Sequence, residues 1–430
     1  MKITVVALGK IGLPLAVQFA RKGHSVIGAD VNESTVAQVN SGMEPFPGEE
    51  HLAQYLKEVI ASGHLHATTD TTAAVAESDA VVVVVPLFVD EEGLPDFGWM
   101  DAATEAIGKG LKPGTLISYE TTLPVGTTRN RFAPALEQLS GLTAGVDFHL
   151  VFSPERVFTG RVFADLRKYP KLVGGIDVAS GARGVKFYED VLDFDSRPDL
   201  ADGNGVWDLG SSEASELAKL AETTYRDVNI ALANQFALFS ESHGIDVQKV
   251  IDASNSQPFS HIHRPGIAVG GHCIPIYPRF YLWNDPAATV VSAARSANSA
   301  MPAHVVNTLA KIHGDLRGQR VVVLGAAYRG GVKETAFSGV FPTVSALEQV
   351  GAIVSVQDPM FTDDELEHYG FKSYHFGEEV DAAIVQADHK EYRQLSKREL
   401  PGLKTILDGR GITSEENWHG VRYHVVGRAL

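Results

Sequence analysis

A strand–turn–helix–strand pattern occurs near each end of the sequence, and it constrains the fold more than any other feature. The first copy runs through the apolar residues 3–8, turns at Gly9 and closes with a second apolar run that ends at Asp30. The second copy turns at Gly325, and its second run ends at Asp358. Buried strands that alternate with helices form parallel sheets covered on both faces. The pattern therefore predicts an α/β protein with two Rossmann-like doubly wound domains.

One long helical segment lies between the two copies. Residues 211–243 contain neither Pro nor Gly and are followed by Gly244. At 1.5 Å per residue such a helix is about 50 Å long, and apolar residues such as Leu217 and Leu232 follow it at helical spacing. A helix of this length joins domains or packs against a partner chain. We expect an N-terminal Rossmann-like domain over 1–205, a central helical domain over 206–305 and a C-terminal Rossmann-like domain over 306–430.

Charge and cysteine content limit the partners and the compartment. The 430 residues carry a net charge of −16, which disfavours nucleic acid and anionic membranes as partners because both are polyanions. The only thiol is that of Cys273, which leaves no internal disulfide and fits a reducing compartment. The longest apolar run, 80–89, contains Pro86 and is much shorter than the ~20 residues of a membrane helix. We expect a cytoplasmic protein.

The first turn has the composition of a dinucleotide-binding loop. It consists of Gly9, Lys10, Ile11 and Gly12. Backbone N–H groups at the start of the following helix attract a pyrophosphate, and Asp30 stands where a carboxylate accepts hydrogen bonds from the ribose and repels the 2′-phosphate of NADP. The first glycine of the usual G-x-G-x-x-G pattern is Ala7 here. We predict NAD as the cofactor; the alternative is a tight turn that binds no ligand.

Cys273 lies in the segment VGGHCIPIYP, between two glycines and two prolines. It can be a small buried hydrophobe, which is the commonest fate of a free cysteine. It can be a metal ligand together with His261, His263 and His272, although the paired C-x-x-C pattern is missing. It can also be a nucleophile, since a thiolate attacks carbonyl carbons and the adjacent glycines let a substrate approach. This loop alone leaves the three interpretations open.

Further segments connect this loop to a known family. The chain contains, in this order, LGKIGLPLA, VPLFVDEEGLPD, ETTLPVGTT, SPERVFTG, AKLAETTYRDVNIALAN, VGGHCIP, GAAYRGG and LDGRG. With these segments in this order, the chain resembles the UDP-glucose/GDP-mannose dehydrogenase family over nearly its whole length. The resemblance implies that two NAD oxidise the C6 alcohol of a nucleotide-activated sugar to a uronic acid, through a thiohemiacetal and a thioester on Cys273. It also implies a homodimer formed through the long helix.

The resemblance assigns further roles residue by residue. Lys219 matches the catalytic lysine, whose cation stabilises the oxyanion at C6. Glu155 matches the glutamate that activates water for thioester hydrolysis, and Thr122 matches a threonine beside the nicotinamide. The matching substrate positions are Arg156, Val157, Lys219, Thr223, Arg226, Gly270, Tyr328, Arg329 and Arg410. Among these, arginines in the C-terminal domain suit a diphosphate.

The sequence departs from the family pattern at several places, and two of them lie four residues after a predicted catalytic residue. Tyr277 stands where an aspartate is common, four residues after Cys273, and Thr223 stands where an asparagine is common, four residues after Lys219. GGHCIP and RDVNIALAN resemble the branch that acts on UDP-N-acetylhexosamines such as UDP-ManNAc or UDP-GlcNAc, and we expect such a substrate and no metal ion. The alternatives are UDP-glucose as the substrate, a catalytically weak nucleotide-sugar-binding homologue, and a two-electron alcohol dehydrogenase.

Overall fold

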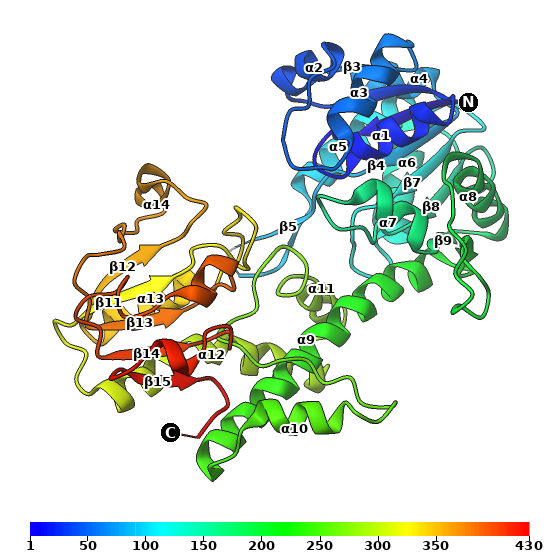
Figure 1. The fold of residues 1–430 in the computed structure, drawn as a ribbon. Helices are drawn as coiled ribbons and strands as arrows, with labels where there is room; N and C mark the ends of the chain where they lie inside the picture. The colour runs from blue at the N-terminus through cyan, green and yellow to red at the C-terminus, as the bar shows by residue number, and fades with distance from the viewer. Residues whose placement is uncertain (91, 430) are drawn as a thin grey trace. The chain divides into compact units, whose positions relative to one another are not determined.

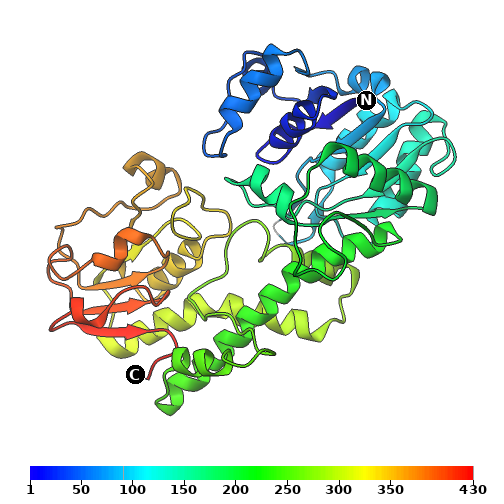
Figure 2. The same ribbon diagram turned by 45° about the vertical axis from the view of Figure 1, so that its right-hand side comes forward.

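The chain divides into two compact units, Met1–Ala221 and Glu222–Leu430, in a computed structural model that describes residues 1–90 and 92–429 (Figure 1). Each unit contains a predominantly parallel sheet covered by helices, and Figure 2 shows the same ribbon turned about its vertical axis. The α/β class and the two Rossmann-like halves predicted from the repeated pattern are confirmed.

The sheet of the first unit has eight strands in the described residues, in the order β10-β9-β8-β7-β4-β1-β2-β3. They are β1 (Lys2–Val6), β2 (Ser25–Ala29), β3 (Leu65–Thr68), β4 (Ala80–Val83), β7 (Leu116–Tyr119), β8 (His149–Phe152), β9 (Lys171–Gly175) and β10 (Val206–Asp208). The strand order reverses between β1 and β4, and doubly wound sheets bind ligands at the carboxyl ends of such strands.

One pair of strands differs from the predicted parallel arrangement. β9 runs antiparallel to β8, whereas the other neighbouring pairs in this sheet are parallel. The connection from β8 to β9, which contains the short helix α7 (Val162–Lys168), therefore stays at the carboxyl end of β8. As a consequence, the first residue of β9, Lys171, lies at the edge of the sheet where ligands bind.

Helices cover the two faces of this sheet. One face packs against α1 (Gly12–Arg21), α3 (Leu52–Ala61), α7 and α8 (Val178–Val191), whose buried side chains share one core with the strands. The helices α4 (Thr71–Glu77), α5 (Gly98–Gly110) and α6 (Ala133–Ser140) pack side by side on the other face. The remaining elements are α2 (Glu33–Asn40), the strand pair β5 (Phe88–Val89) and β6 (Pro95–Asp96), and the π-helix η1 (Thr128–Phe132).

The second unit has a five-stranded parallel sheet in the order β12-β11-β13-β14-β15. Its strands are β11 (Arg320–Leu324), β12 (Ile353–Gln357), β13 (Ala382–Val385), β14 (Thr405–Asp408) and β15 (Arg422–Val425). Its helices are α10 (Val247–Ser254), α11 (Tyr277–Asn284), α12 (Thr289–His313), α13 (Val340–Gln349) and α14 (Asp363–His368), with 3-10 turns η2 (Lys390–Gln394) and η3 (Glu415–Asn417). Residues of α10, α12 and α13 form one core with the sheet, and Tyr392 and Trp418 help to close the other face.

The predicted long helix is confirmed as α9 (Ser212–His243), which begins in the first unit and ends in the second. The predicted apolar stripe is only partly buried. Ala231 is buried, but Leu217 and Leu232 are 43% and 45% exposed, because the buried face of α9 consists mainly of small and polar side chains. Among the described helices, none combines the length and the hydrophobicity required to cross a bilayer.

Candidate active site

The glycine-rich turn after β1 has the geometry of a dinucleotide-binding loop. Ala7 has a φ of 75°, so this alanine adopts the left-handed backbone that glycine normally supplies at the same place. Gly12 is also required, because a Cβ at this residue would lie 1.9 Å from the carbonyl oxygen of Ala7. The space beside Gly9 is open, because no atom apart from those of its chain neighbours lies within 4 Å of the position that a Cβ would take. The backbone around Gly9 is therefore accessible to a pyrophosphate, and the residues of this turn fit NAD.

Asp30 both fixes this turn and keeps acceptor capacity. One carboxylate oxygen accepts the N–H of Leu8 at 2.7 Å, and the other accepts the N–H of Asn32 at 2.9 Å. Each oxygen of an ionised carboxylate has a second lone pair, and the side chain is half-buried. Asp30 is thus placed at the end of β2, beside the glycine turn, with room to accept hydrogen bonds from ribose hydroxyls.

The corresponding aspartate of the second unit is buried. One oxygen of Asp358 accepts the N–H groups of Ala326 and Ala327, at 2.8 and 3.0 Å, and lies 3.1 Å from Nε2 of His389. Burial opposes the charge of Asp358, but the hydrogen bonds from His389 and the backbone hold the pKa of this carboxyl below its usual value. The two strand–turn–helix–strand copies therefore share the turn, but only the first has a partly accessible carboxylate for a ribose.

Glu155 follows β8 and belongs to a buried network of charged side chains. Its Oε2 lies 2.9 Å from Nζ of Lys171, and the same Nζ lies 2.6 Å from Oε2 of Glu120. The other oxygen of Glu120 accepts the Tyr188 hydroxyl at 2.6 Å. Oε1 of Glu155 accepts the N–H groups of Arg156 and of the next residue. The predicted catalytic glutamate is therefore held in one orientation from both sides.

The electrostatics of this network separate the two carboxyl groups. Burial raises the pKa of Glu120 to about 7, against the opposing attraction of Lys171. Burial also acts on Glu155, but the Lys171 ammonium and the backbone hydrogen bonds outweigh it and lower the pKa of Glu155. Glu155 is thus the ionised member of the pair at neutral pH, which is the form that can accept a proton from water.

Sequence reasoning missed Glu120 and Lys171 as site residues. Glu120 ends the apolar segment TLISYE, and Lys171 begins the apolar segment KLVGG. A single charged residue beside a buried strand indicates a buried ion pair. The direction of β9 was the missing information, because only an antiparallel β9 brings Lys171 to the carboxyl end of β8.

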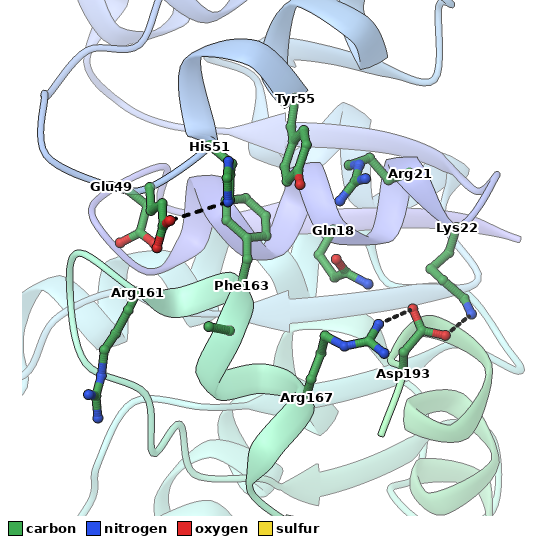
Figure 3. A pocket seen from close by; sticks show the side chains of 12 residues that line it. Gln18, Arg21, Lys22, Glu49, His51, Tyr55, Arg161, Phe163, Arg167 and Asp193 are labelled. Atoms are coloured by element: carbon green, nitrogen blue, oxygen red, sulfur yellow. Dashed lines mark hydrogen bonds and ion pairs between the residues drawn. The ribbon is translucent and has the colours of Figure 1, made fainter. Parts of the chain in front are cut away.

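Another buried carboxylate, that of Glu49, holds the loop that follows Glu155. The two oxygens of Glu49 accept the N–H groups of Gly160 and Val162, each at 2.6 Å. Glu49 also borders a pocket of about 480 Å³ lined by side chains of α1, α3 and α7, among them Tyr55 (Figure 3). This pocket shares no residue with the predicted cofactor or substrate positions, so we do not assign it to the reaction.

Thr122 and Lys219 come from two neighbouring elements of the first unit. Thr122 is buried in the turn that follows β7, and the hydroxyl of the adjacent Thr121 donates to the Val85 carbonyl at 2.6 Å. Lys219 is half-buried in the first turns of α9. Farther along α9, in the second unit, Thr223 is buried and Arg226 is exposed.

Cys273 is exposed, at the end of the loop that precedes α11. Its carbonyl accepts the N–H groups of Ile276 and Tyr277 at 3.2 and 2.9 Å, which fixes the turn. The exposure argues against the interpretation as a buried hydrophobe. The residues described by the structure contain no group of three or more His, Cys, Asp or Glu side chains placed to hold a metal ion. The role of Cys273 as a nucleophile stays a prediction.

Arg410 anchors the loop before Cys273 to the sheet of the second unit. Its guanidinium donates to the backbone carbonyls of Gln386, Ala268 and Tyr328, at 2.6, 3.3 and 3.2 Å. Gly270 lies close to the same place, since a Cβ there would be 2.7 Å from Cβ of Tyr328. The fold thus brings together Gly270, Tyr328 and Arg410. Three hydrogen-bond donors of Arg410 already bind backbone carbonyls.

Arg329 is the more accessible cation at this edge of the second sheet. It is exposed, and its Nε lies 3.2 Å from the hydroxyl oxygen of Tyr328. Three donors of Arg410 bind backbone carbonyls, whereas Arg329 is exposed and its guanidinium lies over the ring of Tyr328. Pairing of either arginine with a diphosphate stays a prediction.

Comparison with protein families gives matches over most of the chain. The UDP-glucose/GDP-mannose dehydrogenase family matches with its NAD binding domain over residues 1–192, its central domain over 213–300 and its UDP binding domain over 322–415.

Individual proteins match over the whole length. The UDP-N-acetyl-D-mannosamine dehydrogenase of Pyrococcus horikoshii is 33% identical over 427 residues, which cover 96% of each chain. The solved structure of the UDP-D-ManNAc dehydrogenase from that organism has a TM-score of 0.86 at 30% identity and covers 100% of this chain and 99% of its own. A UDP-glucose dehydrogenase from Pyrobaculum islandicum has a TM-score of 0.85 at 26% identity, covering 99% and 98%.

Proposed function

The chain belongs to the UDP-glucose/GDP-mannose dehydrogenase family, and on this premise we propose that it oxidises the C6 alcohol of a UDP-N-acetylhexosamine to the uronic acid. It is an NAD-dependent nucleotide-sugar dehydrogenase. The observation that carries the proposal is the full-length similarity to UDP-N-acetyl-D-mannosamine dehydrogenases. UDP-ManNAc is accordingly the first substrate to test, followed by UDP-GlcNAc and UDP-glucose.

In the first oxidation, the chain must bind the cofactor and stabilise charge at C6. NAD, when bound, would supply the acceptor for the hydride that leaves C6. Gly9 and Gly12 leave room for its pyrophosphate, and Asp30 is placed to accept hydrogen bonds from its ribose. We assign to Lys219 the stabilisation of the oxyanion that develops as the C6 hydroxyl loses its proton. The product of this step is an aldehyde.

In the second oxidation, we assign the covalent step to Cys273. The thiolate sulfur forms a bond to the aldehyde carbon, and the carbonyl oxygen takes up a proton, which gives a thiohemiacetal. Loss of that proton and of a second hydride from C6, which a second NAD would accept, leaves a thioester. Water then attacks the thioester carbon and the C–S bond breaks, which releases the carboxylate and returns the thiolate. Two hydrides leave the sugar, and one oxygen atom enters it from water.

Glu155 is the residue to which we assign the proton of the attacking water. Lys171 lies 2.9 Å from its Oε2 and keeps the group ionised. The N–H groups of Arg156 and Val157 hold its other oxygen. A carboxylate that is both ionised and fixed suits a base that must meet one water molecule in a defined direction.

The finer organisation is also proposed. We infer a cofactor domain over 1–205, a central domain over 206–305 and a UDP-sugar domain over 306–430. We further infer a homodimer through α9, because this helix exposes large apolar side chains: Leu217, Tyr225, Leu232, Phe236 and Phe239. A catalytic thiolate needs a reducing environment, which supports a cytoplasmic enzyme.

A panel of nucleotide sugars tests this proposal. UDP-ManNAc, UDP-GlcNAc, UDP-GalNAc, UDP-glucose and GDP-mannose would each be incubated with NAD, and kcat/KM would be measured from NADH formation. We expect a UDP-N-acetylhexosamine to exceed UDP-glucose by at least about tenfold, which corresponds to about 1.4 kcal/mol in the transition state. A preference for UDP-glucose would contradict the proposed UDP-N-acetylhexosamine and make UDP-glucose the substrate. No turnover with any sugar, despite measurable binding, would favour the catalytically weak homologue.

A further inference from the structure

A buried carboxylate on α9 joins two elements that carry predicted catalytic residues. Glu216 is fully buried. Its Oε2 accepts the N–H of Gly126 at 2.5 Å, and its Oε1 accepts the N–H and the hydroxyl of Thr128 at 2.9 and 2.7 Å. Residues from 90 positions away in the chain are thus tied to the first turns of α9.

Each side of this contact lies close in sequence to a predicted catalytic residue. Gly126 and Thr128 follow Thr122 in the same turn after β7, and Glu216 precedes Lys219 by three residues, which is almost one helical turn. Gly126 has a φ of 85°, and Thr128 begins the π-helix η1. A glycine adopts this φ readily, whereas a π-helix is uncommon and often lies at a functional site. The Glu216 carboxylate joins this irregular segment to α9 from the buried side, and the Arg129–Glu213 ion pair joins the two elements at the surface.

From this contact we propose that Glu216 is a positioning residue: its ionised carboxylate fixes the turn that carries Thr122 relative to the helix that carries Lys219. The inference rests on the proposed function, because it takes the roles of Thr122 and Lys219 from there. Glu216 touches neither substrate nor cofactor in this account and acts through the two elements that it joins.

The chemistry of the contact requires a carboxylate. Three donors converge on the two oxygens of Glu216, so both oxygens must be acceptors. A glutamine has one acceptor oxygen, and its NH₂ group would face a backbone N–H. Protonation has a similar effect, since one oxygen becomes a donor. Either change leaves at least one buried N–H without an acceptor, which breaks the contact on one side.

The contact is also sensitive to pH. Burial raises the pKa of Glu216 to about 7, although the hydrogen bonds from Thr128 and Gly126 oppose this shift. The charged groups near it are Glu213 on α9, whose carboxylate adds to the increase, and Arg129 in η1. The contact is therefore fully formed only above neutral pH, and catalysis should rise as the pH rises through about 7.

The main experiment compares Glu216→Gln with Glu189→Gln in the full-length enzyme. Glu189 is the control, because it is an exposed glutamate near the end of α8, away from the turn after β7 and from α9. We expect Glu216→Gln to lower kcat by 10- to 100-fold, to leave the KM for NAD within about threefold, and to remove the rise of kcat near pH 7. Glu189→Gln should keep kcat and the KM for NAD within about threefold of the unmutated enzyme, and it should keep the rise of kcat near pH 7. A Glu216→Gln enzyme with unchanged kcat and an unchanged pH profile would overturn the proposal.

A second variant and a second measurement keep the proposal testable if Glu216→Gln does not fold. Thr128→Val removes only the hydroxyl donor, and it should lower kcat in the same direction even if Glu216→Gln does not fold. Hydrogen–deuterium exchange of the peptide 121–132 should be faster in both variants than in the unmutated chain. Unchanged exchange would contradict the proposal without reference to the substrate. If the unmutated enzyme oxidises no sugar, it is the proposed function that fails, whereas the exchange experiment still decides the contact.

Discussion

The ammonium group of Lys171 lies 2.9 Å from the Glu155 carboxylate, and both side chains are almost completely withdrawn from solvent. The ammonium also contacts Glu120, so one buried cation compensates two carboxyl groups. The network forms at the carboxyl ends of β7 and β8, where a parallel sheet places catalytic groups. The contribution of Lys171 can therefore be tested by removing its charge alone.

Lys171→Met keeps the aliphatic length of the side chain and leaves two buried carboxyl groups without a cation. Breaking a buried ion pair in this way costs about 3–5 kcal/mol of unfolding free energy, and uronic acid formation should fall by more than tenfold. The matched control is Lys168→Met, which removes an exposed lysine at the end of α7. Urea unfolding and product analysis check both variants. Equal stability of the two variants would contradict the buried network.

The raised pKa of Glu120 predicts a pH dependence of stability. Burial raises this pKa to about 7, whereas an unfolded glutamate titrates near 4.3. The folded chain therefore binds more protons between about pH 4.5 and 7, and the unfolding free energy falls as the pH rises through this window. Glu120→Gln cannot ionise, so its unfolding free energy should not show this decrease. As the pH rises from 5 to 7, the unfolding free energy of the variant should increase by about 1–3 kcal/mol relative to that of the unmutated chain. Parallel pH profiles of the unfolding free energy would contradict this prediction.

Asp30 should determine the choice between NAD and NADP. Its carboxylate stands at the end of β2, where it accepts the N–H groups of Leu8 and Asn32. The 2′-phosphate of NADP would meet this negative charge, so we expect kcat/KM for NAD to exceed that for NADP by at least about 100-fold. Asp30→Ser should lose most of this ratio and keep a short acceptor for the turn. Equal use of both cofactors by the unmutated enzyme would remove Asp30 from the cofactor site.

The homodimer is tested at the exposed face of α9. Leu232 and Phe236 lie one turn apart and are 45% and 37% exposed. If this face forms the interface, changing both to arginine should convert a dimer into a monomer in analytical ultracentrifugation at micromolar concentration. Val250→Arg on α10 is the control, because Val250 is exposed to a similar extent, at 43%. A monomeric unmutated enzyme would contradict the proposed assembly.

Much of the first unit could be predicted from the sequence, because its signals are local. The apolar runs, Gly9 and Asp30 mark a strand, a turn and a second strand by themselves. The long helix was also evident, but its buried face was not. Side-chain spacing alone cannot distinguish an apolar stripe that faces the core from one left exposed, as Leu217 shows.

The groups that support the site could not be found in this way. Lys171 reaches Glu155 only because β9 reverses direction, and Glu216 reaches Gly126 across 90 residues of chain. Such contacts depend on tertiary structure and leave only a weak trace in the sequence, a charge within an apolar segment. The left-handed backbone of Ala7 could not be predicted either, because alanine does not favour this conformation.

The most direct measurement is the number of NADH molecules formed per UDP-sugar consumed, in the unmutated enzyme and in Cys273→Ser. A thiol that carries the second oxidation predicts two NADH per sugar and no free aldehyde in the unmutated enzyme. Cys273→Ser should turn over more slowly by orders of magnitude, even when the aldehyde is supplied, because an alkoxide leaves an ester far less readily than a thiolate leaves a thioester. One NADH per sugar with release of aldehyde, or near-normal uronic acid formation by Cys273→Ser, would contradict the account.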